Sequence, residues 1–427
     1  MNQYYNKKIH ILGSSGTLMS GLCHLGSQAG LLLTGSDNLF NPPLGHLLKD
    51  CFKYPLENPI WKESDIIVVA NKFSRKDPLI HEMMMAGKKL ISCMEFLDLF
   101  LHDKKLIAIG GTHGKSTTSS LIAWILDQNG LNPSFLIGGY PKNFKINARY
   151  SQSEYFILEA DEYDTAFFDK RSKIENLWPH FLVLNTIEFD HADIFKSFNE
   201  IEDVFNLSLK KVSPQGAIFS VPQEKYEPLI PQGIKWVNVN DEIDKIKHIH
   251  ENQYSYDNIK ISWPLLTKTN NLNLALAISL AHHLGIKKED ILKAVNSFTG
   301  VARRAEKIKV GNLEFWHDFA HHPSAIKKTL DAISDLNDKF YVWIEKASNS
   351  MKQGIFDKDL MKLEKNYEEM KFFYYQKNII NDAINFLTLE DFIKACKNDD
   401  CCGILFSNNP STWPQILCEF SMPNQEA

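Results

Sequence analysis

One stretch of the sequence constrains the fold more than any other: residues 106–127 read LIAIGGTHGKSTTSSLIAWILD. An apolar run, a glycine-rich turn and apolar residues at helical spacing predict a strand, a loop and a helix. Glycines in such a turn let backbone N–H groups converge on an anion at the N-terminus of a helix, where the helix dipole favours negative charge. Lys115 would then reach the outer phosphates of a nucleotide, and the hydroxyl of Ser116 would bind Mg²⁺.

This loop departs from the general phosphate-loop pattern, G-x-x-x-x-G-K-[ST], because Ile109 stands where that pattern has its first glycine. Residues 110–117 nevertheless keep the expected strand before them and helix after them. A glycine-rich turn with an exposed lysine is the alternative interpretation, and these flanking elements make it the less favoured one.

The length of 427 residues predicts about three domains. A net charge of −5 gives no electrostatic argument for a nucleic-acid or membrane partner, so phosphate binding has to be local. No apolar run approaches the ~18 residues that span a bilayer, and no signal-peptide core precedes the first strand, so we expect a cytoplasmic protein. Seven cysteines without a CxxC pair indicate reduced thiols.

The N-terminal segment has the pattern of a nucleotide-binding doubly wound fold. A predicted strand at 9–12 is followed by the turn 13–17 and a helix, and a second strand ends before the acidic residue Asp37. The dinucleotide fingerprint G-x-G-x-x-G is absent, because Ser15 occupies the position of its second glycine. Another nucleotide in the same crevice is therefore favoured over a dinucleotide.

Two further strands of the central segment, 155–158 and 181–184, run into polar stretches that carry carboxylates and a histidine. Beside a phosphate loop, the carboxyl ends of strands are where a nucleotide-bound metal needs its ligands. Either stretch alone would be interpreted as a solvated acidic loop. Their occurrence together, after a phosphate loop, favours a metal site.

The rest of the chain offers weaker signals. Asn270 and Asn273 open a predicted helix and would by default cap it. The adjacent pair Arg303 and Arg304 could stabilise charge on a transferred phosphoryl group, or could be a solvated surface pair. Beyond them, apolar runs at 313–316, 340–344, 372–375 and 403–407 predict a further sheet of parallel strands with helices between them.

Five stretches, in this order and at compatible spacing, resemble the Mur ligases: GTHGKSTT from Gly111, EADEYD from Glu159, EFDHAD from Glu188, the pair RR from Arg303, and HDFAHHP from His317. The resemblance covers nearly the whole chain. Members of this family are ATP-dependent enzymes that build the peptide of bacterial cell-wall precursors. The resemblance implies three α/β domains: a Rossmann-like domain at 1–103 that binds UDP-muramate, a central P-loop domain at 104–302 that binds ATP, and a Rossmann-like domain at 303–427.

Carried over position by position, the resemblance implies a role for each of several residues. The catalytic set is Lys115, Glu159, His191 and Arg303. The ATP-binding set is Gly111, Thr112, His113, Gly114, Lys115, Ser116, Thr117, Asn270, Asn273, Arg303 and Asp318. The UDP-muramate set is Gly13, Ser14, Gly16, Thr17, Asp37 and Asn71. The peptide set is Lys170, Arg171, Ser348, Asn349 and Lys352. The Mg²⁺ ligands are Ser116, Glu159 and His191.

Four stretches point to one branch of the family: GSSGTLMSG from Gly13, GSDNLFNPPLGHLL from Gly35, EADEYDTAFFDKRSK from Glu159 and SNSMK from Ser348. That branch joins L-alanyl-γ-D-glutamyl-meso-diaminopimelate to UDP-N-acetylmuramate through an acyl phosphate, with ATP and Mg²⁺. The first alternative is the ligase that adds L-alanine to the same acceptor. A second, from a different class, is a P-loop nucleotide switch without an amine acceptor. No nucleic acid or membrane is implied as a partner.

This chain also departs from the pattern of the family. Ser116 replaces the usual threonine and keeps its hydroxyl, whereas Thr269 replaces a histidine that could stack on adenine. At Lys346 and Ala347 the branch usually has Pro-Arg. If that arginine binds a substrate carboxylate, Ala347 leaves the far end of the peptide to other residues.

Overall fold

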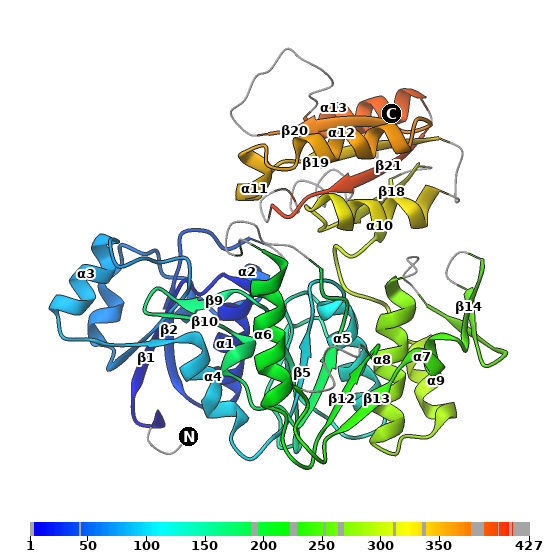
Figure 1. Cartoon of the computed structure of the whole chain (residues 1–427). Coiled ribbons are helices and arrows are strands. Elements are labelled where there is room, and N and C mark those ends of the chain that lie inside the picture. Colours follow the sequence, from blue (N-terminus) through cyan, green and yellow to red (C-terminus); the bar gives the residue numbers. More distant parts are fainter. Residues whose placement is uncertain are drawn as a thin grey trace, which may run out of the picture.

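The computed structural model describes residues 4–41, 44–188, 195, 197–222, 229–250, 253–263, 269–310, 313–334, 339–376, 388–399, 401–409 and 412. Three α/β sheets follow one another along the chain. In Figure 1 the C-terminal sheet and its helices lie above the other two parts, which sit side by side. The predicted three-part α/β architecture is confirmed. The boundaries at 103/104 and 302/303 stay predictions.

The first sheet is parallel, in the order β2-β1-β3-β4. Because β1 lies between β2 and β3, the turn after β1 opens at the point where the strand order reverses, which is where α/β sheets bind ligands. The elements of this part are β1 (Lys8–Leu12), α1 (Thr17–Gln28), β2 (Leu32–Ser36), α2 (Leu44–Leu47), η2 (Asp50–Phe52), η3 (Pro59–Glu63), β3 (Ile66–Val69), α3 (Pro78–Met85), β4 (Lys89–Ser92) and α4 (Cys93–Leu101).

The central sheet has seven strands in the order β13-β12-β11-β5-β8-β6-β7, parallel except for the β6–β7 pair. Its strands are β5 (Lys105–Gly110), β6 (Ser134–Leu136), β7 (Ala148–Arg149), β8 (Tyr155–Glu159), β11 (Phe181–Leu184), β12 (Ala217–Ser220) and β13 (Lys235–Asn238). Since β5 lies between β8 and β11, the phosphate loop after β5 sits between the polar ends of both neighbours.

Helices cover both faces of this sheet, and small antiparallel pairs are attached to it. The helices are α5 (Lys115–Gln128), η4 (Ile174–Asn176), α6 (Phe198–Lys210), α7 (Asn240–Ile243), α8 (Thr269–His283) and α9 (Lys288–Asn296). The small pairs are the hairpin β9 (Asp164–Ala166)–β10 (Asp169–Ser172) and the three-stranded sheet β14 (Ile246–His250), β15 (Gln253–Tyr256) and β16 (Ile259–Ser262).

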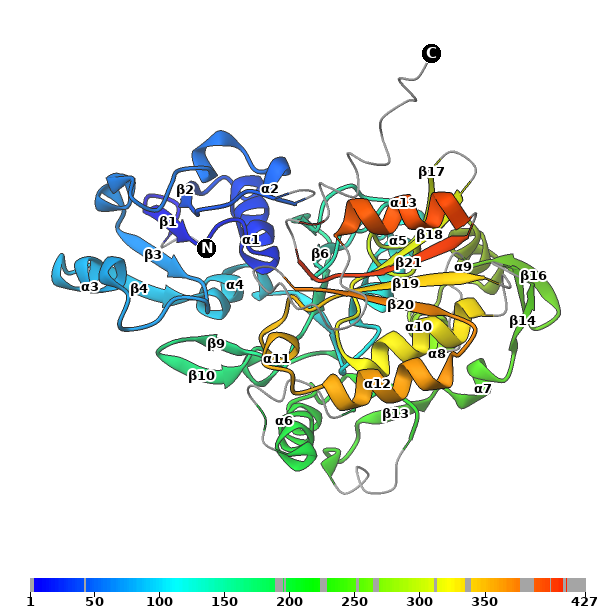
Figure 2. The same ribbon diagram turned by 90° about the horizontal axis from the view of Figure 1, so that it is seen from above.

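The third sheet has the order β17-β18-β21-β19-β20, and all its pairs are parallel except β17–β18. The antiparallel edge strand β17 was not expected from the sequence. Figure 2 shows α13 on one side of this sheet and α10 and α12 on the other. The elements are β17 (Glu306–Val310), β18 (Leu313–Asp318), α10 (Pro323–Ile333), β19 (Phe340–Glu345), α11 (Asn349–Lys352), α12 (Asp357–Asn366), β20 (Lys371–Tyr375), α13 (Leu389–Asp399) and β21 (Cys402–Phe406).

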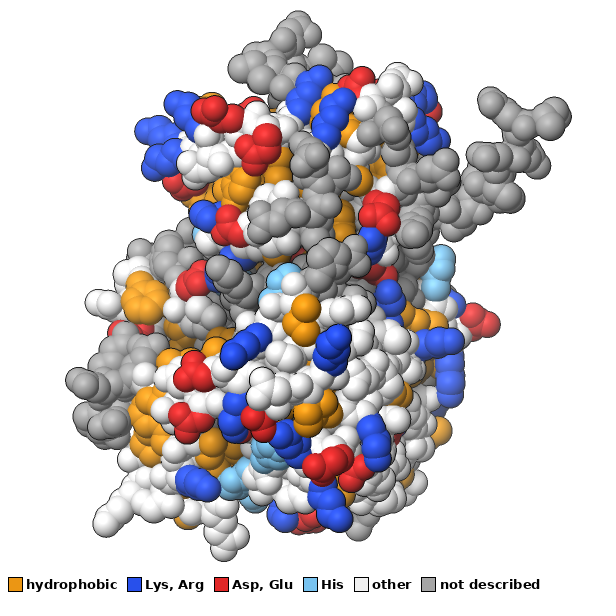
Figure 3. Space-filling view, turned by 90° about the vertical axis from the view of Figure 1, so that its right-hand side faces the viewer, with side chains coloured by type: hydrophobic (Ala, Val, Ile, Leu, Met, Phe, Trp, Pro, Cys, Tyr) orange, Lys and Arg blue, Asp and Glu red, His pale blue; other side chains and the backbone are white. Residues whose placement is uncertain are grey.

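Two surface features bear on partners. On the face in Figure 3, lysine and arginine side chains are interspersed with aspartate and glutamate, and no field of one sign extends across the view. Across the described residues, no helix is both long and apolar enough to cross a membrane.

Candidate active site

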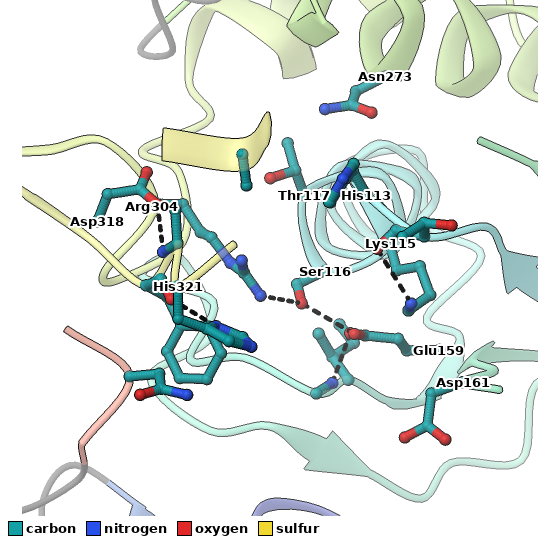
Figure 4. Close-up of a pocket in the computed structure, with 18 of the residues that line it drawn as sticks. His113, Lys115, Ser116, Thr117, Glu159, Asp161, Asn273, Arg304, Asp318 and His321 are labelled. Carbon is teal, nitrogen blue, oxygen red and sulfur yellow. Dashed lines mark hydrogen bonds between the residues drawn. The ribbon is translucent and has the colours of Figure 1, made fainter. Parts of the chain in front are cut away.

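A cavity of about 450 Å³ lies where the three parts of the molecule meet. Figure 4 shows side chains of the phosphate loop, of the β8 end and of the C-terminal part pointing into it. The lining includes Thr17, Thr112, His113, Gly114, Lys115, Ser116, Thr117, Gly138, Glu159, Asp161, Tyr163, Lys173, Asn270, Asn273, Arg304, Ala305, Asp318, Phe319, Ala320, Lys328 and Asn408.

The phosphate loop packs so closely against its neighbours that two of its positions require glycine. Gly111 and Gly114 have φ angles of 117° and 84°, in the region that side chains disfavour. A Cβ on Gly111 would lie 2.9 Å from the Cβ of Asn185, and one on Gly114 would lie 2.2 Å from the Oδ1 of Asn273. Gly114 also precedes the first turn of α5, so the backbone N–H groups of that turn face the cavity.

Lys115 forms a buried ion pair that the sequence did not predict. Its Nζ lies 2.9 Å from Oε2 of Glu162 and donates to the carbonyl oxygen of Gly111 at 2.6 Å. Burial by itself would lower the pKa of Lys115, but Glu162 and the carboxylates beside it hold that pKa above its ordinary value. Lys115 is therefore a charged ammonium group inside the loop.

Ser116 and Glu159 meet at the centre of the cavity. The Ser116 hydroxyl donates to Oε1 of Glu159 at 2.9 Å, and the backbone N–H of Gly138 donates to Oε2 at 2.6 Å. Burial raises the pKa of Glu159, although Lys115 and Arg304 are close enough to oppose the shift. Because burial disfavours the ionised form of Glu159, a bound cation would stabilise that form, which fits the predicted metal ligands. His191, the third predicted ligand, lies outside the described residues, within which no three His, Cys, Asp or Glu side chains form a metal-binding group.

The two asparagines of α8 adjoin the phosphate loop. Asn273 donates to Oδ1 of Asn270 at 2.8 Å and accepts from the Thr118 hydroxyl at 3.2 Å. Both asparagines line the cavity. Because α8 begins at Thr269, Asn270 is a helical residue here and not the helix cap that is the default reading of the sequence.

The two adjacent arginines have different surroundings. Arg304 lines the cavity, and its Nη2 lies 3.3 Å from the Ser116 hydroxyl, opposite Glu159 in Figure 4. Arg303 is outside that lining and donates from Nη2 to the carbonyl oxygen of Ser407 at 2.8 Å. Its burial lowers its pKa to about 10. Both guanidinium groups pack on the ring of Phe319, at 4.9 and 5.0 Å from its centre.

Asp318, at the end of β18, reaches the cavity from the C-terminal part. The backbone N–H groups of Ala305 and Ala320 each donate to one of its oxygens at 2.7 Å. Burial raises the pKa of this carboxyl group. The structure thus brings Asp318 to the same cavity as Lys115, which lies 203 positions earlier in the sequence.

The predicted UDP-muramate residues gather around the first turn of the N-terminal sheet. Asp37 accepts from the backbone N–H and the hydroxyl of Ser15, and its Oδ1 lies 2.5 Å from the Nζ of Lys72. Of this predicted set, the cavity lining includes Thr17. Of the other members, Gly13, Ser14 and Gly16 are in the β1–α1 turn, and Asn71 donates to the carbonyl oxygen of Asp164 at 3.5 Å.

The predicted peptide-binding residues do not line the cavity. Lys170 and Arg171 are exposed on the β9–β10 hairpin, where they pair with Asp164 and Asp169. Three others lie in or next to the short helix α11: Ser348, just before it, accepts from the backbone N–H of Met351, Lys352 at its end is exposed, and the side chain of Asn349 lies outside the described residues. The described side chains of this set are therefore outside the cavity lining to which the phosphate loop belongs.

The sequence analysis gave no separate role to Glu188, which pairs with the lining residues His113 and Lys328. The Oε2 of Glu188 lies 3.4 Å from the Nε2 of His113, and its Oε1 lies 2.5 Å from the Nζ of Lys328 on α10. The contacts with His113, and then with Lys328, lower the pKa of Glu188 to about 2. Glu188 was quoted within a family stretch, but no pattern could pair it with a lysine 140 positions further along the chain.

The fold and the cavity define a class: a three-part α/β protein with a phosphate loop at the meeting point of its parts. The sequence model of the Mur ligase middle domain matches residues 109–281. The UDP-N-acetylmuramate–L-alanyl-γ-D-glutamyl-meso-2,6-diaminoheptandioate ligase of Haemophilus influenzae is 35% identical over 377 residues, which cover 83% of each chain. This chain belongs to the Mur ligase family, whose members are ATP-dependent ligases that form C–N bonds.

Two further matches come from two branches of the family. The UDP-N-acetylmuramate–L-alanine ligase of Clostridium tetani is 30% identical over 348 residues, 77% of this chain and 74% of that protein. A crystal structure of a murein peptide ligase from Psychrobacter arcticus superposes with a TM-score of 0.73 and 27% identity, over 99% of this chain and 100% of that one. The predicted family, fold class and enzyme class are confirmed.

Proposed function

We propose that this protein is an ATP-dependent amide ligase that joins the tripeptide L-alanyl-γ-D-glutamyl-meso-diaminopimelate to UDP-N-acetylmuramate in the recycling of cell-wall peptide. The observation that carries the proposal is the 35% identity, over 83% of both chains, to a ligase named for that reaction. The L-alanine ligase remains the second candidate, favoured by a match of 30% identity. We infer a cytoplasmic enzyme acting on small molecules.

The reaction has two steps. A carboxylate oxygen of the muramate attacks the γ-phosphorus of ATP, the bond to ADP breaks, and an acyl phosphate forms. The amine of the tripeptide then attacks the acyl carbon and phosphate leaves. The chain supplies charge stabilisation at the transferred phosphoryl group and holds the reactants together, which avoids a large entropic cost.

The phosphate-binding roles fall to the loop and to an arginine. Lys115 would leave Glu162 to contact the outer phosphates, and the N–H groups at the start of α5 would bind the same phosphates. Besides Lys115, we assign Arg304 as the positively charged side chain that contacts the phosphates, because it lines the cavity beside Ser116. Arg303, predicted for this role from the sequence, would instead hold the loop at Ser407.

The remaining ATP roles follow the predicted positions. Asn270 and Asn273 lie beside the loop where an adenine could accept and donate hydrogen bonds, and Asp318 offers a carboxylate to a ribose hydroxyl. Ser116 and Glu159 would hold Mg²⁺, with His191 as the third predicted ligand, and the bound cation would neutralise phosphate charge. The N-terminal turn with Thr17 would bind the nucleotide part of the acceptor.

Product analysis tests the proposal. The protein is supplied with ATP, Mg²⁺ and UDP-N-acetylmuramate, and either the tripeptide or L-alanine is added. We expect a new UDP-muramoyl-tripeptide mass with the tripeptide and ADP release that depends on both substrates. Product with L-alanine alone would assign the chain to the other branch, and phosphate release without any muramate would indicate a nucleotide switch.

A further inference from the structure

A buried lysine, Lys173, lines the cavity. Its side chain is 10% exposed, and its Nζ lies 2.9 and 3.1 Å from the two oxygens of Asp161. Lys173 directly follows the β9–β10 hairpin. That hairpin contacts the N-terminal part, since the thiol of Cys93 on α4 donates to the carbonyl oxygen of Thr165 at 3.5 Å.

The backbone fixes Lys173 in place. Its N–H donates to the carbonyl oxygen of Tyr163 at 3.0 Å, and the N–H of Ile174 donates to that of Asp161 at 3.2 Å. The side chain of Ile174 is buried in the core, so this turn cannot rotate without exposing it. Lys170, three positions earlier, is 71% exposed and pairs with Asp164 on its own hairpin. The turn therefore directs Lys173, and not Lys170, toward the cavity.

Each lysine or arginine in the cavity lining has a distinct position. Lys115 and Arg304 flank Ser116, where the phosphates are expected. Lys328 is held on the C-terminal wall by Glu188. Lys173 is the remaining cation of the lining, which also includes Thr17 at the start of α1. An acceptor held by the N-terminal part has to bring its carboxylate into this cavity to reach the phosphates.

We propose that Lys173 binds the reacting carboxylate of the muramate acceptor and holds it for attack on the γ-phosphorus; this rests on the proposed function. In the structure, the Asp161 carboxylate holds the position at Lys173 that we propose for the carboxylate of the acceptor. The Asp161 side chain is 36% exposed and can turn toward water, whereas Lys173 is nearly enclosed. When the acceptor binds, Lys173 would release the carboxylate of Asp161 and bind that of the muramate. No proton is transferred in this exchange, so Lys173 stays an ammonium group.

Binding measurements on Lys173→Met test the proposal. UDP-N-acetylglucosamine serves as the comparison ligand, because it lacks the lactyl carboxylate of UDP-N-acetylmuramate. A charged hydrogen bond at this site predicts that Lys173→Met weakens binding of UDP-N-acetylmuramate, and raises its KM, by roughly 10- to 100-fold. Binding of UDP-N-acetylglucosamine and the KM for ATP should change by less than about threefold. Lys173→Arg should recover part of the loss.

The matched control is Lys104→Met. Lys104 is also a partly buried lysine of the central part, but it bonds to the carbonyl oxygens of Ser151 and Ser153 and lies outside the cavity lining. Equal weakening of both UDP-sugars by Lys173→Met, or no change in either, would overturn the proposal. If that variant does not fold, Lys173→Gln is put through the same pair of ligands with the same criteria. Absence of product from the wild-type protein would instead reject the proposed function.

Discussion

The phosphate-loop wall of the cavity and its C-terminal wall are built in different ways. The first consists of residues on adjacent strand ends of one sheet, with Lys115 and Ser116 on the loop after β5 and Glu159 at the end of β8. The second is carried across a linker in which Arg303 and Ala305 have φ angles of 63° and 45°. The first wall is fixed by pairing within a sheet, whereas the second depends on how the linker turns.

A consequence is that the two walls should respond differently to substitution. Substitution of a side chain in the phosphate loop removes an interaction whose geometry is fixed by the sheet. Substitution of a side chain in the linker can lower the rate of the reaction, or it can weaken the attachment of the C-terminal part. Three predictions separate these cases, in order of decreasing effect.

The largest effect is expected at the phosphate loop. Lys115→Met should lower ATP-dependent product formation by at least about 1,000-fold, because the outer phosphates lose their ammonium partner. It also leaves Glu162 buried without a cation, which destabilises the protein. The double variant Lys115→Met, Glu162→Gln should recover the melting temperature but not the activity. Near-normal turnover in either variant would refute the role of the loop.

The two arginines of the linker are expected to contribute in different ways. Arg304→Ala should lower kcat by about 100-fold, since its guanidinium lies beside Ser116. Arg303→Ala should lower kcat by less than about tenfold and instead cost about 1–2 kcal/mol of stability, because the carbonyl of Ser407 loses its donor. Steady-state kinetics and thermal melts on both variants make the test. A larger fall in kcat for Arg303→Ala would reverse the assignment.

The smallest effect concerns the ion pair that joins the two walls. The pKa of Glu188, about 2, lies below its ordinary value of 4.5, so its stabilising contribution is present above about pH 4.5 and is lost as the pH falls toward 2. Glu188→Gln should lower the melting temperature by about 1–2 °C at pH 7, and by less at pH 3.

The exposed pair of Lys8 and Glu63 provides the control for this measurement. Glu63→Gln should leave the melting temperature nearly unchanged at pH 7, because exposed ion pairs contribute little. A difference between wild type and Glu188→Gln that grows as the pH falls would show that Glu188 is not held ionised by His113 and Lys328.

Much of the phosphate-loop wall could be predicted because its signals are local. The run from β5 through Ser116 is continuous in sequence, and strand and helix periodicities identify it. The acidic residues after β8 follow an apolar run in the same way. The pair of Lys115 and Glu162 could not be predicted, because it depends on how far β8 continues before the chain turns.

The sequence by itself determined the three α/β parts, the phosphate loop and the family, since these rest on periodicity and on residues close together in the chain. Only the tertiary structure decided which of two nearby residues lines the cavity: Arg304 does and Arg303 does not, and Lys173 does and Lys170 does not. The physical reason is that, in a turn, backbone dihedral angles and the burial of adjacent side chains set the direction of each side chain. Those angles are fixed by packing between segments that lie far apart in the sequence.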